Sequence, residues 1–476
     1  MNYSSFNGFF SNFLPDIRLE KRAEKVMTDM HTFGKVVVNK FCTTNTDKIG
    51  AYRMFSNLSF DHNNLLEGVY HHCKERQGVN HLLCIQDTTE LNFTHHIKRI
   101  GKEDKNIGPV SINDMAGFFC HPMLVIDSEQ KAPIGFSSID LWNRSWDKKD
   151  KFERDYKNLK ISEKESFRWI KSAQETKKVL SETSLLTIIG DRESDIYEEL
   201  ATVPDDRTHL LIRSSINRRL FDSNEKLFEV LDSSRQRSTY NLTVKGNKKR
   251  KNRIARMSLK YSKVKILRPK KKGMNDYPMY VEMWAIEARE LKESVPQGED
   301  PILWRLLTTH SIEKVEDAMK YLDWYSNRWF IEELFRIMKK KGFGIEDSQL
   351  ETGSGLKKLV VMALQVALTT MTLKLSIKNK QEIDAGIVFS PEQIQFIKLL
   401  MIDLEGETEK QKNPYTKGTL AWSTWGISRL SGWSGYSSHG PPGYITIKSG
   451  LDKFYDKFEG YRIALKLLNL KDVYKE

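Results

Sequence analysis

The stretch that decides the fold is DWYSNRWFIEELFRIMKKK, residues 323–341. It contains no proline or glycine, and Gly342 follows it as a natural stop, so we predict one continuous α-helix over these residues. At intervals of three, four and seven residues, one stripe of this helix carries the polar side chains of Tyr325, Arg328, Glu332 and Lys339. A second stripe beside it is apolar and can pack on a core. The polar stripe is therefore either a candidate site, with a carboxylate among phosphate-binding groups, or an ordinary charged surface.

The charge balance of the whole chain points to a polyanionic partner. The 476 residues include 76 Lys and Arg against 63 Asp and Glu, which gives a formal net charge of +13. Nucleic acid is the partner that such a surplus favours most. With 39% hydrophobic and 11% aromatic residues the chain is not a disordered protein, and its length predicts about two to four domains.

Cysteine usage and hydropathy indicate the compartment. The four cysteines form no Cys-x-x-Cys pair and no disulfide-dense pattern, which fits a reducing cytoplasm. The N-terminus lacks the basic-then-apolar order of a secretory signal. The most apolar stretch, residues 359–375, is interrupted by Gln and Thr and flanked by lysines, so we expect a buried helix there and no membrane partner.

The chain divides into three segments of different character. Residues 1–62 are basic with helical periodicity, and we expect a helical DNA-binding domain there; the alternative is a helical cap on the main domain. Residues 63–375 alternate strand-like and helix-like runs, which is typical of an α/β core with a mixed sheet. Within them, residues 208–310 predict a β-rich insertion. Residues 376–476 are expected to form a distinct, mostly helical end region.

Two runs of basic residues fall in predicted loops of the β-rich segment, at 248–253 and 269–273. They are either clamps for a DNA backbone or solvated hairpin tips.

Three acids stand at the ends of predicted elements or on them. Asp87 ends a strand-like run that residues 88–93 follow as a hairpin partner or second strand, Asp191 ends the strand at 184–190, and Glu332 lies on the helix. The intervals are 104 and 141 residues, so only a fold could unite them. Three carboxylates can share two divalent ions that activate an attacking hydroxyl and stabilise the leaving oxygen of a phosphodiester. Mg²⁺ suits this chemistry, with Mn²⁺ as a substitute.

These residues carry a resemblance to a known family. The spacing of Tyr325, Arg328, Glu332 and Lys339 resembles the Y-R-E-K signature of bacterial insertion-sequence transposases with a DDE site, in the insertion-sequence-four family. Residues 85–89 and 191–197 resemble the two Asp motifs of that family. The similarity extends to residues 50–53, 249–253, 303–304 and 422–430, and the two ends of the chain match more loosely. The resemblance implies an α/β fold with an RNase H-like catalytic core and a β-rich insertion, flanked by an N-terminal helical DNA-binding domain and a C-terminal, mostly helical dimerisation domain.

The resemblance also implies roles for individual residues. The catalytic metal ligands would be Asp87, Asp191 and Glu332, holding two Mg²⁺ or Mn²⁺ ions. The neighbouring Glu333 is a rival that would point about 100° away on a helix. Trp304 would stack on a base flipped out of the duplex, the alternative being a core tryptophan on a strand. The implied DNA contacts are Tyr325, Arg328, Lys339, Trp304, Arg213, Arg53, Lys249, Arg250 and Arg253.

The activity implied by the resemblance is cut-and-paste transposition in the bacterial cytoplasm, at the nucleoid. Water nicks double-stranded DNA at the inverted repeat of a transposon end, the freed 3′-OH makes a hairpin, a second water opens it, and the 3′-OH ends then attack target DNA. The family acts as a homodimer, and the predicted helix at 451–470 either supplies the dimer contact or folds back on its own chain. Two other functions stay open, a non-catalytic DNA-binding regulator and a nuclease of the same fold without strand transfer.

Overall fold

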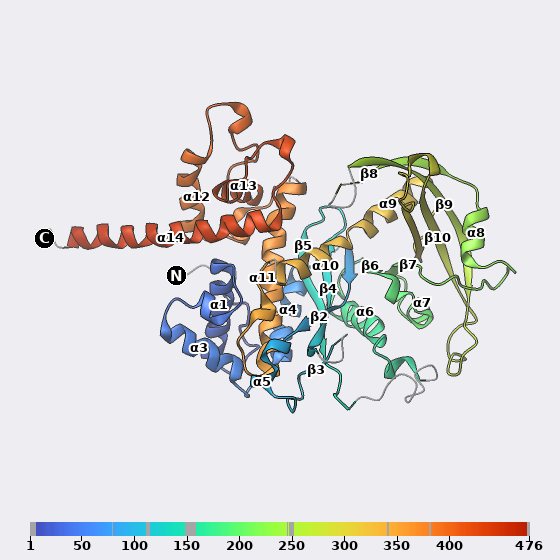
Figure 1. The fold of residues 1–476 in the computed structure, drawn as a ribbon, viewed down its shortest axis with the longest axis horizontal. Coiled ribbons are helices and arrows are strands. Elements are labelled where there is room, and N and C mark those ends of the chain that lie inside the picture. The colour runs from blue at the N-terminus through green and yellow to red at the C-terminus, as the bar shows by residue number, and fades with distance from the viewer. Residues whose placement is uncertain are drawn as a thin grey trace.

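The structure is a computed structural model, and it describes residues 6–78, 80–110, 115–147, 159–244, 246, 252–339, 342–379 and 382–473. Within this part of the chain, eleven strands form one mixed β-sheet (Figure 1). The strands are β1 (His81–Gln86), β2 (Thr89–Asn92), β3 (Gly108–Pro109), β4 (Ala116–Asp127), β5 (Pro133–Trp142), β6 (Leu185–Gly190), β7 (Thr208–Arg213), β8 (Ser238–Val244), β9 (Arg253–Leu267), β10 (Tyr280–Glu290) and β11 (Leu303–Thr308).

The helices surround this sheet and extend beyond it at both ends of the chain (Figure 1). They are α1 (Ile17–Phe33), α2 (Val38–Phe41), α3 (Asn45–Ser56), α4 (His62–Glu75), α5 (Ile97–Ile100), α6 (Phe167–Val179), α7 (Tyr197–Thr202), α8 (Leu227–Ser233), α9 (Val315–Ser326), α10 (Trp329–Met338), α11 (Gly353–Asn379), α12 (Pro391–Leu404), α13 (Leu420–Leu430) and α14 (Tyr444–Val473).

Five strands in the order β5-β4-β1-β6-β7 make the part of the sheet that matters for the site. Strand β4 is antiparallel to β5 and β1, whereas β1, β6 and β7 run parallel. Parallel strands point the same way, so the residues that follow β1, β6 and β7 come out at one edge of the sheet. This edge receives Asp87 and Asp191.

The prediction of strands on both sides of Asp87 is confirmed, but a hairpin between them is wrong. Strands β1 and β2 both pair with β4 and not with each other. The two edges of β1 are already occupied by β4 and β6, so β2 has no place beside it. Asp87 and Thr88 therefore connect two strands that pair with successive segments of β4.

The β-rich segment predicted at 208–310 continues the same sheet. Strand β11 pairs antiparallel with β7, and β10, β9 and β8 follow it in antiparallel order. Five strands, β7 to β11, lie in this segment, so its predicted β-rich character is confirmed. Because the backbone ladder is unbroken from β1 to β8, the added strands are fixed in orientation relative to the edge that carries Asp87 and Asp191.

Both faces of the central strands are buried. In β1, Leu83 and Ile85 belong to one hydrophobic core and Leu82 and Cys84 to a second, because successive side chains of a strand point to opposite faces. Helices α9, α10 and α11 contribute to the first core, and α6, α7 and α8 contribute to the second.

The continuous helix predicted over residues 323–341 is wrong, because two helices lie in residues 323–338; residues 340 and 341 are outside the described part of the chain. Helix α9 ends at Ser326 and α10 begins at Trp329. The side chains of Ser326 and Asn327 both donate to the carbonyl oxygen of Asp323, at 2.6 and 3.0 Å. Short polar side chains that bond to the backbone compete with helical hydrogen bonds, and this competition accounts for the break.

The predicted buried helix over the apolar stretch is confirmed. The stretch Gly353–Lys378 of α11 is long and apolar enough to cross a membrane by length and composition, but 89% of its 18-residue apolar window is buried inside the protein. Helix α11 contacts α1, α3, α4, α10, α13 and α14, so it is the common support of the N-terminal and C-terminal helices.

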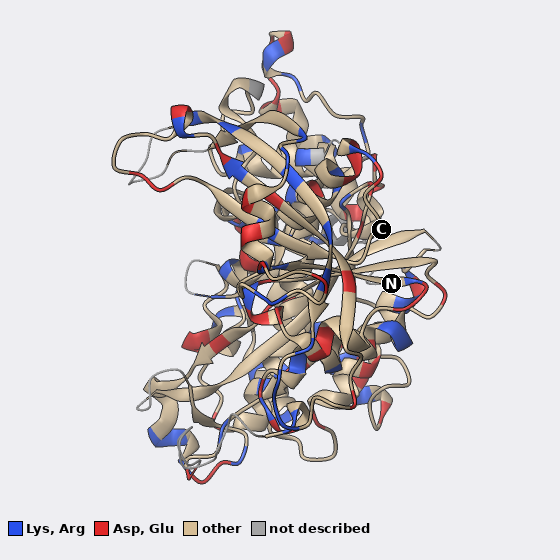
Figure 2. Cartoon of the chain, turned by 90° about the vertical axis from the view of Figure 1, so that its right-hand side faces the viewer, with Lys and Arg blue, Asp and Glu red and all other residues tan. Residues whose placement is uncertain are grey.

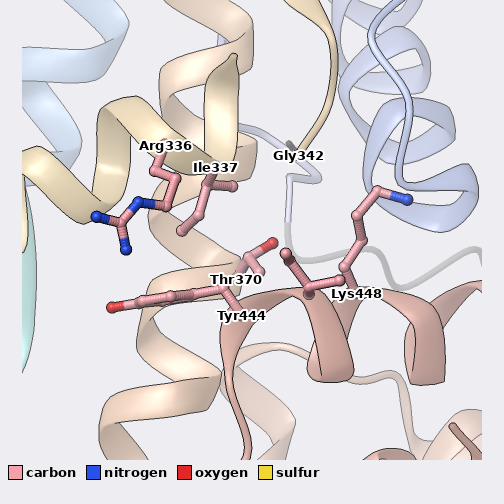
Figure 3. A pocket seen from close by; sticks show the side chains of 7 residues that line it. Arg336, Ile337, Gly342, Thr370, Tyr444 and Lys448 are labelled. Atoms are coloured by element: carbon pink, nitrogen blue, oxygen red, sulfur yellow. The ribbon is translucent and has the colours of Figure 1, made fainter. Parts of the chain in front are cut away.

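The first turn of α14 packs against α10 and α11. Figure 3 shows Tyr444, from the first turn of α14, beside Ile337 of α10 and Thr370 of α11, where these side chains line a small hollow. The first half of α14 shares a hydrophobic core with α12 and α13. Its second half projects from the body of the protein (Figure 1), and Ile463, Leu467 and Leu468 there are more than half exposed, at 51%, 56% and 58%.

Candidate active site

Three carboxylates from distant parts of the chain meet at the edge where β1 and β6 end. Asp87 directly follows β1, Asp191 directly follows β6, and Glu332 lies in the first turn of α10. Burial raises the pKa of Asp87 to about 7, and the negative charges of Asp191 and Glu332 contribute to the rise. Like charges act on a pKa in this way only at short range, so the predicted set of three acids is brought together.

A guanidinium group lies between two of these acids. Arg328, the N-cap residue of α10, donates from Nη1 to Asp87 Oδ2 at 3.0 Å and from Nη2 to Glu332 Oε1. Its side chain is only 19% exposed, so both ion pairs are shielded from water. Arg328 therefore supplies the positive charge that these carboxylates require.

The donor chemistry at this edge fits a divalent ion. Carboxylate oxygens are the ligands that Mg²⁺ and Mn²⁺ prefer. The pKa of Asp87 is raised first by burial and then by the negative charges of Asp191 and Glu332, so several carboxylates gather at this edge. Among the described residues, however, no group of three or more His, Cys, Asp and Glu side chains is arranged so as to hold a metal ion. In this arrangement Arg328 occupies the space between Asp87 and Glu332.

The rival acid faces elsewhere. Glu333 is 5% exposed, accepts from Trp329 Nε1 at 3.0 Å and pairs with Arg336. Its second carboxylate oxygen lies 3.7 Å from Lys374 Nζ of α11. Glu333 thus anchors α10 to α11, while Glu332 is the residue of the pair that faces Asp87.

Aromatic and basic side chains continue the same edge across β7 and β11. Arg213, the last residue of β7, donates from Nη2 to the carbonyl oxygen of Leu303 at 3.1 Å. Trp304 of β11 meets the ring of Tyr325 edge-on, with 5.7 Å between ring centroids. Burial raises the pKa of the Tyr325 hydroxyl, and the nearby charges of Arg328 and Arg213 oppose that rise. These predicted DNA contacts therefore surround the carboxylates.

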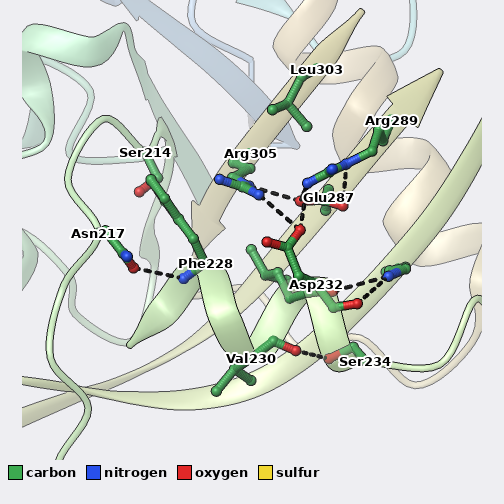
Figure 4. Close-up of polar contacts among 12 residues, drawn as sticks. Ser214, Asn217, Phe228, Val230, Asp232, Ser234, Glu287, Arg289, Leu303 and Arg305 are labelled. Carbon is green, nitrogen blue, oxygen red and sulfur yellow. Dashed lines mark hydrogen bonds and ion pairs between the residues drawn. The ribbon is translucent and has the colours of Figure 1, made fainter. Parts of the chain in front are cut away.

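Neighbouring side chains of β11 point to opposite faces of the sheet, and the contacts of Arg305 differ from those of Trp304. Arg305 points to the opposite face and donates from Nε to Glu287 Oε2 at 2.7 Å (Figure 4). Arg289 bonds to the same glutamate at 3.0 Å, and Asp232 accepts from both arginines. Glu287 is 1% exposed, so this cluster is a neutralised part of the fold, and only the Trp304 face of β11 turns toward Tyr325.

The remaining predicted contacts lie apart from the carboxylates. Lys339 follows α10 in extended conformation. Burial raises the pKa of the Cys120 thiol on β4, and the charge of Lys339 opposes that rise. Arg53 is exposed on α3. Arg253 pairs with the buried Glu290. The other two predicted contacts, Lys249 and Arg250, lie outside the described residues.

Sequence analysis missed a set of polar residues directly behind the carboxylates. Arg168 of α6, Glu199 of α7 and His121 of β4 are hydrogen-bonded to the residues on either side of Asp87 and to the turn after Asp191. Burial raises the pKa of Glu199 to about 8. One sequence signal could have found the set: a polar Gln86 ends the otherwise apolar run LLCIQ.

Comparison with known proteins is consistent with this geometry. Residues 165–369 match the family model described as a transposase DDE domain. The matched segment contains Asp191, Glu332 and Trp304, and Asp87 lies before it. The match implies an RNase H-like core, with which the strand order β5-β4-β1-β6-β7 agrees. Residues 165–369 are therefore similar to a transposase DDE domain, and this match supports a DNA-cleaving transposase.

Proposed function

We propose that this protein is a cut-and-paste DNA transposase of the insertion-sequence-four family. It binds the inverted repeats at transposon ends, cleaves them through a hairpin and transfers the 3′-OH ends into target DNA. One observation carries the proposal: Asp87, Asp191 and Glu332 converge at one sheet edge, with Arg328 bonded to two of them.

The three carboxylates would hold two Mg²⁺ ions, or Mn²⁺ in their place. When bound, such ions activate the attacking oxygen and stabilise the leaving oxygen of a phosphodiester. In each step the oxygen of water or of a 3′-OH forms a bond to phosphorus while the bond to the leaving oxygen breaks. The same carboxylates can serve every step, because attacking and leaving groups are always oxygen atoms.

The cationic and phenolic groups at the edge would hold the phosphates of the DNA end. Arg328, Tyr325 and Arg213 lie at the carboxylates, and Lys339 lies farther along, toward β4. Such donors bind phosphate oxygens without reading the base sequence, so they position the strand for attack. A phosphate that takes up the guanidinium of Arg328 also frees oxygens of Asp87 and Glu332 for the ions.

Trp304 would receive a base flipped out of the hairpin. Its ring is half-buried and stands against Tyr325, which supports a fixed orientation. A base stacked on an aromatic side chain gains about 1–3 kcal/mol, which offsets part of the cost of unstacking it from the duplex.

Parts of the DNA farther from the cleavage site would be bound by residues outside this edge. Figure 2 shows Lys and Arg interspersed with Asp and Glu over one side of the molecule. A more uniform basic surface forms at the β9–β10 turn, where Arg268, Lys270, Lys271 and Lys272 line a hollow of about 390 Å³. Together with the β8–β9 loop and the N-terminal helices, including Arg53, this turn would bind the DNA backbone.

The domains follow from this assignment. Residues 1–62 would bind DNA, residues 63–375 would catalyse, and residues 376–476 would form a homodimer across two paired ends at the bacterial nucleoid. The exposed apolar residues of α14 support the dimer contact. The double variant Ile463→Ser/Leu467→Ser should bind single ends normally in gel-shift assays and fail to pair them. Normal pairing would assign the projecting half of α14 another role.

The proposal is tested by excision and strand transfer in vitro. The substrate is DNA with the element's own inverted repeats, incubated with Mg²⁺ and wild-type protein or Asp87→Asn. Hairpin and joined products that depend on metal and disappear in the variant support the proposal. Specific end binding without cleavage would favour the regulator, and hydrolysis without joining would favour the nuclease.

A further inference from the structure

We propose that a ring of hydrogen-bonded side chains behind the carboxylates sets the position of Asp87 relative to Asp191, and that Gln86 and Glu199 are positioning residues in this ring. The inference rests on the proposed function and extends it to residues that do not touch the substrate.

The inner half of the ring joins strand β1 to the turn after β6. Gln86 donates from Nε2 to Glu199 Oε1 at 3.1 Å. Ser194 donates from Oγ to the same carboxyl group, 2.8 Å from each oxygen. Gln86 directly precedes Asp87, and Ser194 comes three residues after Asp191. All three side chains of this inner half are fully buried, so water cannot replace their hydrogen bonds.

The outer half joins the same two segments through one guanidinium. Arg168 of α6 donates from Nε to Thr88 Oγ1 at 2.9 Å and from Nη2 to Glu193 Oε2 at 2.6 Å. Thr88 directly follows Asp87, and Glu193 comes two residues after Asp191. Each catalytic aspartate is therefore flanked by residues that are bonded across to the other segment.

His121 closes the ring and fixes the direction of its hydrogen bonds. Its Nδ1 lies 2.9 Å from Thr88 Oγ1, and its Nε2 lies 3.2 Å from Gln86 Oε1. Arginine can only donate, so Thr88 accepts from Arg168. Gln86 Oε1 can only accept, so the hydrogen of the neutral His121 ring is on Nε2, and Nδ1 accepts from Thr88. His121 then donates from Nε2 to Gln86, which donates onward to Glu199. Every donor in the sequence from Arg168 to Glu199 has a matching acceptor.

The ring holds the two chain segments together beyond the end of the hydrogen-bonded ladder between β1 and β6. The parallel ladder between β1 and β6 ends at the pair Ile85 and Ile189, before either aspartate. Gly190 allows the turn to close, because a Cβ atom there would lie 2.3 Å from Ser194 Oγ. The negative charges of Asp87 and Asp191 repel each other across this gap, and hydrogen bonds on both sides of the pair resist their separation.

The test measures Mn²⁺ binding to the full-length protein bound to DNA that carries the element's own inverted repeats, by electron paramagnetic resonance titration. Gln86→Leu leaves His121 and Glu199 without their shared partner and should weaken Mn²⁺ binding about 10–100-fold, the usual effect of losing a residue that orients metal ligands. The double variant Q86E/E199Q keeps every hydrogen bond. The carboxyl group at position 86 accepts from His121 and from the amide at position 199, whose oxygen accepts from Ser194. It should restore binding to near the wild-type value.

A matched control separates positioning from general loss of stability. Thr187 is buried in β6 near the opposite end, where its hydroxyl bridges His81 and His310 at 2.7 Å each. Thr187→Val should lower the melting temperature as Gln86→Leu does, with unchanged Mn²⁺ affinity. Unchanged affinity in folded Gln86→Leu, or an equal loss in Thr187→Val, would overturn the inference. Should Gln86→Leu not fold, Thr88→Val opens the ring at its outer side and is judged by the same measurement. A wild-type protein that binds no Mn²⁺ would instead overturn the metal site of the proposed function.

Discussion

The two ends of the same parallel strands make opposite use of ionisable groups. At their carboxyl ends β1, β6 and β7 present Asp87, Asp191 and Arg213. Toward their amino ends, His81 and Thr187 are joined to His310, which follows β11, and His209 stacks on His310 with 4.0 Å between ring centroids. The same sheet thus has a charged edge and an edge of imidazoles.

Burial shifts the pKa values of the ionisable groups at the two edges in opposite directions. It raises the pKa of Asp87 to about 7, and Asp191 raises it further by repulsion. It lowers the pKa of His81 to about 4 and that of His310 well below its usual range, with His209, His81 and Lys320 adding to the effect at His310. The histidine edge is stable because it stays neutral, whereas the carboxylate edge keeps charge that a cation must balance. The proposed active site lies at the carboxylate edge, where the charges repel each other unless a cation binds.

The largest expected effect separates two adjacent glutamates. Glu332→Gln should reduce DNA cleavage and joining about 1,000-fold or more, because metal ions held by carboxylates contribute several kcal/mol to such steps. End binding in a gel-shift assay should remain. Glu333→Gln is the control: it weakens the anchor to α11 and should lower the melting temperature while cleavage persists. Loss of cleavage in Glu333→Gln alone would reverse the assignment.

The next effect concerns the aromatic part of the charged edge. Trp304→Ala should lower the yield of hairpin by a factor that corresponds to about 1–3 kcal/mol, the stacking of one base. Gel analysis of end-labelled DNA measures the yield. Trp284→Ala removes a half-buried tryptophan from the neighbouring strand β10 and serves as control. Trp304→Phe should retain part of the activity, and a hairpin yield insensitive to all three changes would make Trp304 a core residue.

A substitution at the histidine edge should lower the free energy of unfolding without changing the rate of DNA cleavage. Thr187→Val leaves the buried His310 and the half-buried His81 without their common partner, which costs about 1–3 kcal/mol in the free energy of unfolding. Urea unfolding measures the loss. Cleavage of transposon ends, assayed well below the melting temperature, should keep its wild-type rate. A fall in rate larger than the fall in folded fraction would show that the two edges are coupled.

The smallest effect is a dependence of stability on pH. The folded-state pKa of His310 is lowered, so the unfolded chain binds more protons below its pKa of about 6.5, and stability must fall as pH falls through this range. One such imidazole contributes about 1 kcal/mol between pH 6.5 and 5.5. His310→Gln should flatten the profile of unfolding free energy, and the exposed His95→Gln should leave it unchanged. An equal slope in both variants would contradict the neutral-edge interpretation.

Local patterns in the sequence were sufficient for the strands and for the carboxylates. Apolar runs that end in an acid placed β1 and β6, and helical spacing distinguished Glu332 from Glu333. The break at Asn327 was missed because the apolar periodicity runs through it, while side-chain bonds to the Asp323 carbonyl stop the helix.

The sequence alone did not predict which segments far apart in the chain pair with each other. The hairpin expected after β1 failed because β4, which is later in the chain, takes the place beside it. The ring around Asp87 was missed for a related reason. Gln86 meets His121 and Glu199 across 35 and 113 residues, and a hydrogen bond over such a separation leaves no periodic trace.

The unbroken ladder from β7 through β11 to β8 has an evolutionary consequence. Strands added at the free margin of a sheet leave the register of the older strands unchanged, so hairpins such as β9–β10 can lengthen, shorten or change composition without disturbing the ends of β1 and β6. On the proposed function, the DNA-binding surface of these strands can therefore change while the carboxylates at the ends of β1 and β6 keep their places. Lineages that share Asp87, Asp191 and Glu332 should diverge most in the segment between β7 and α9.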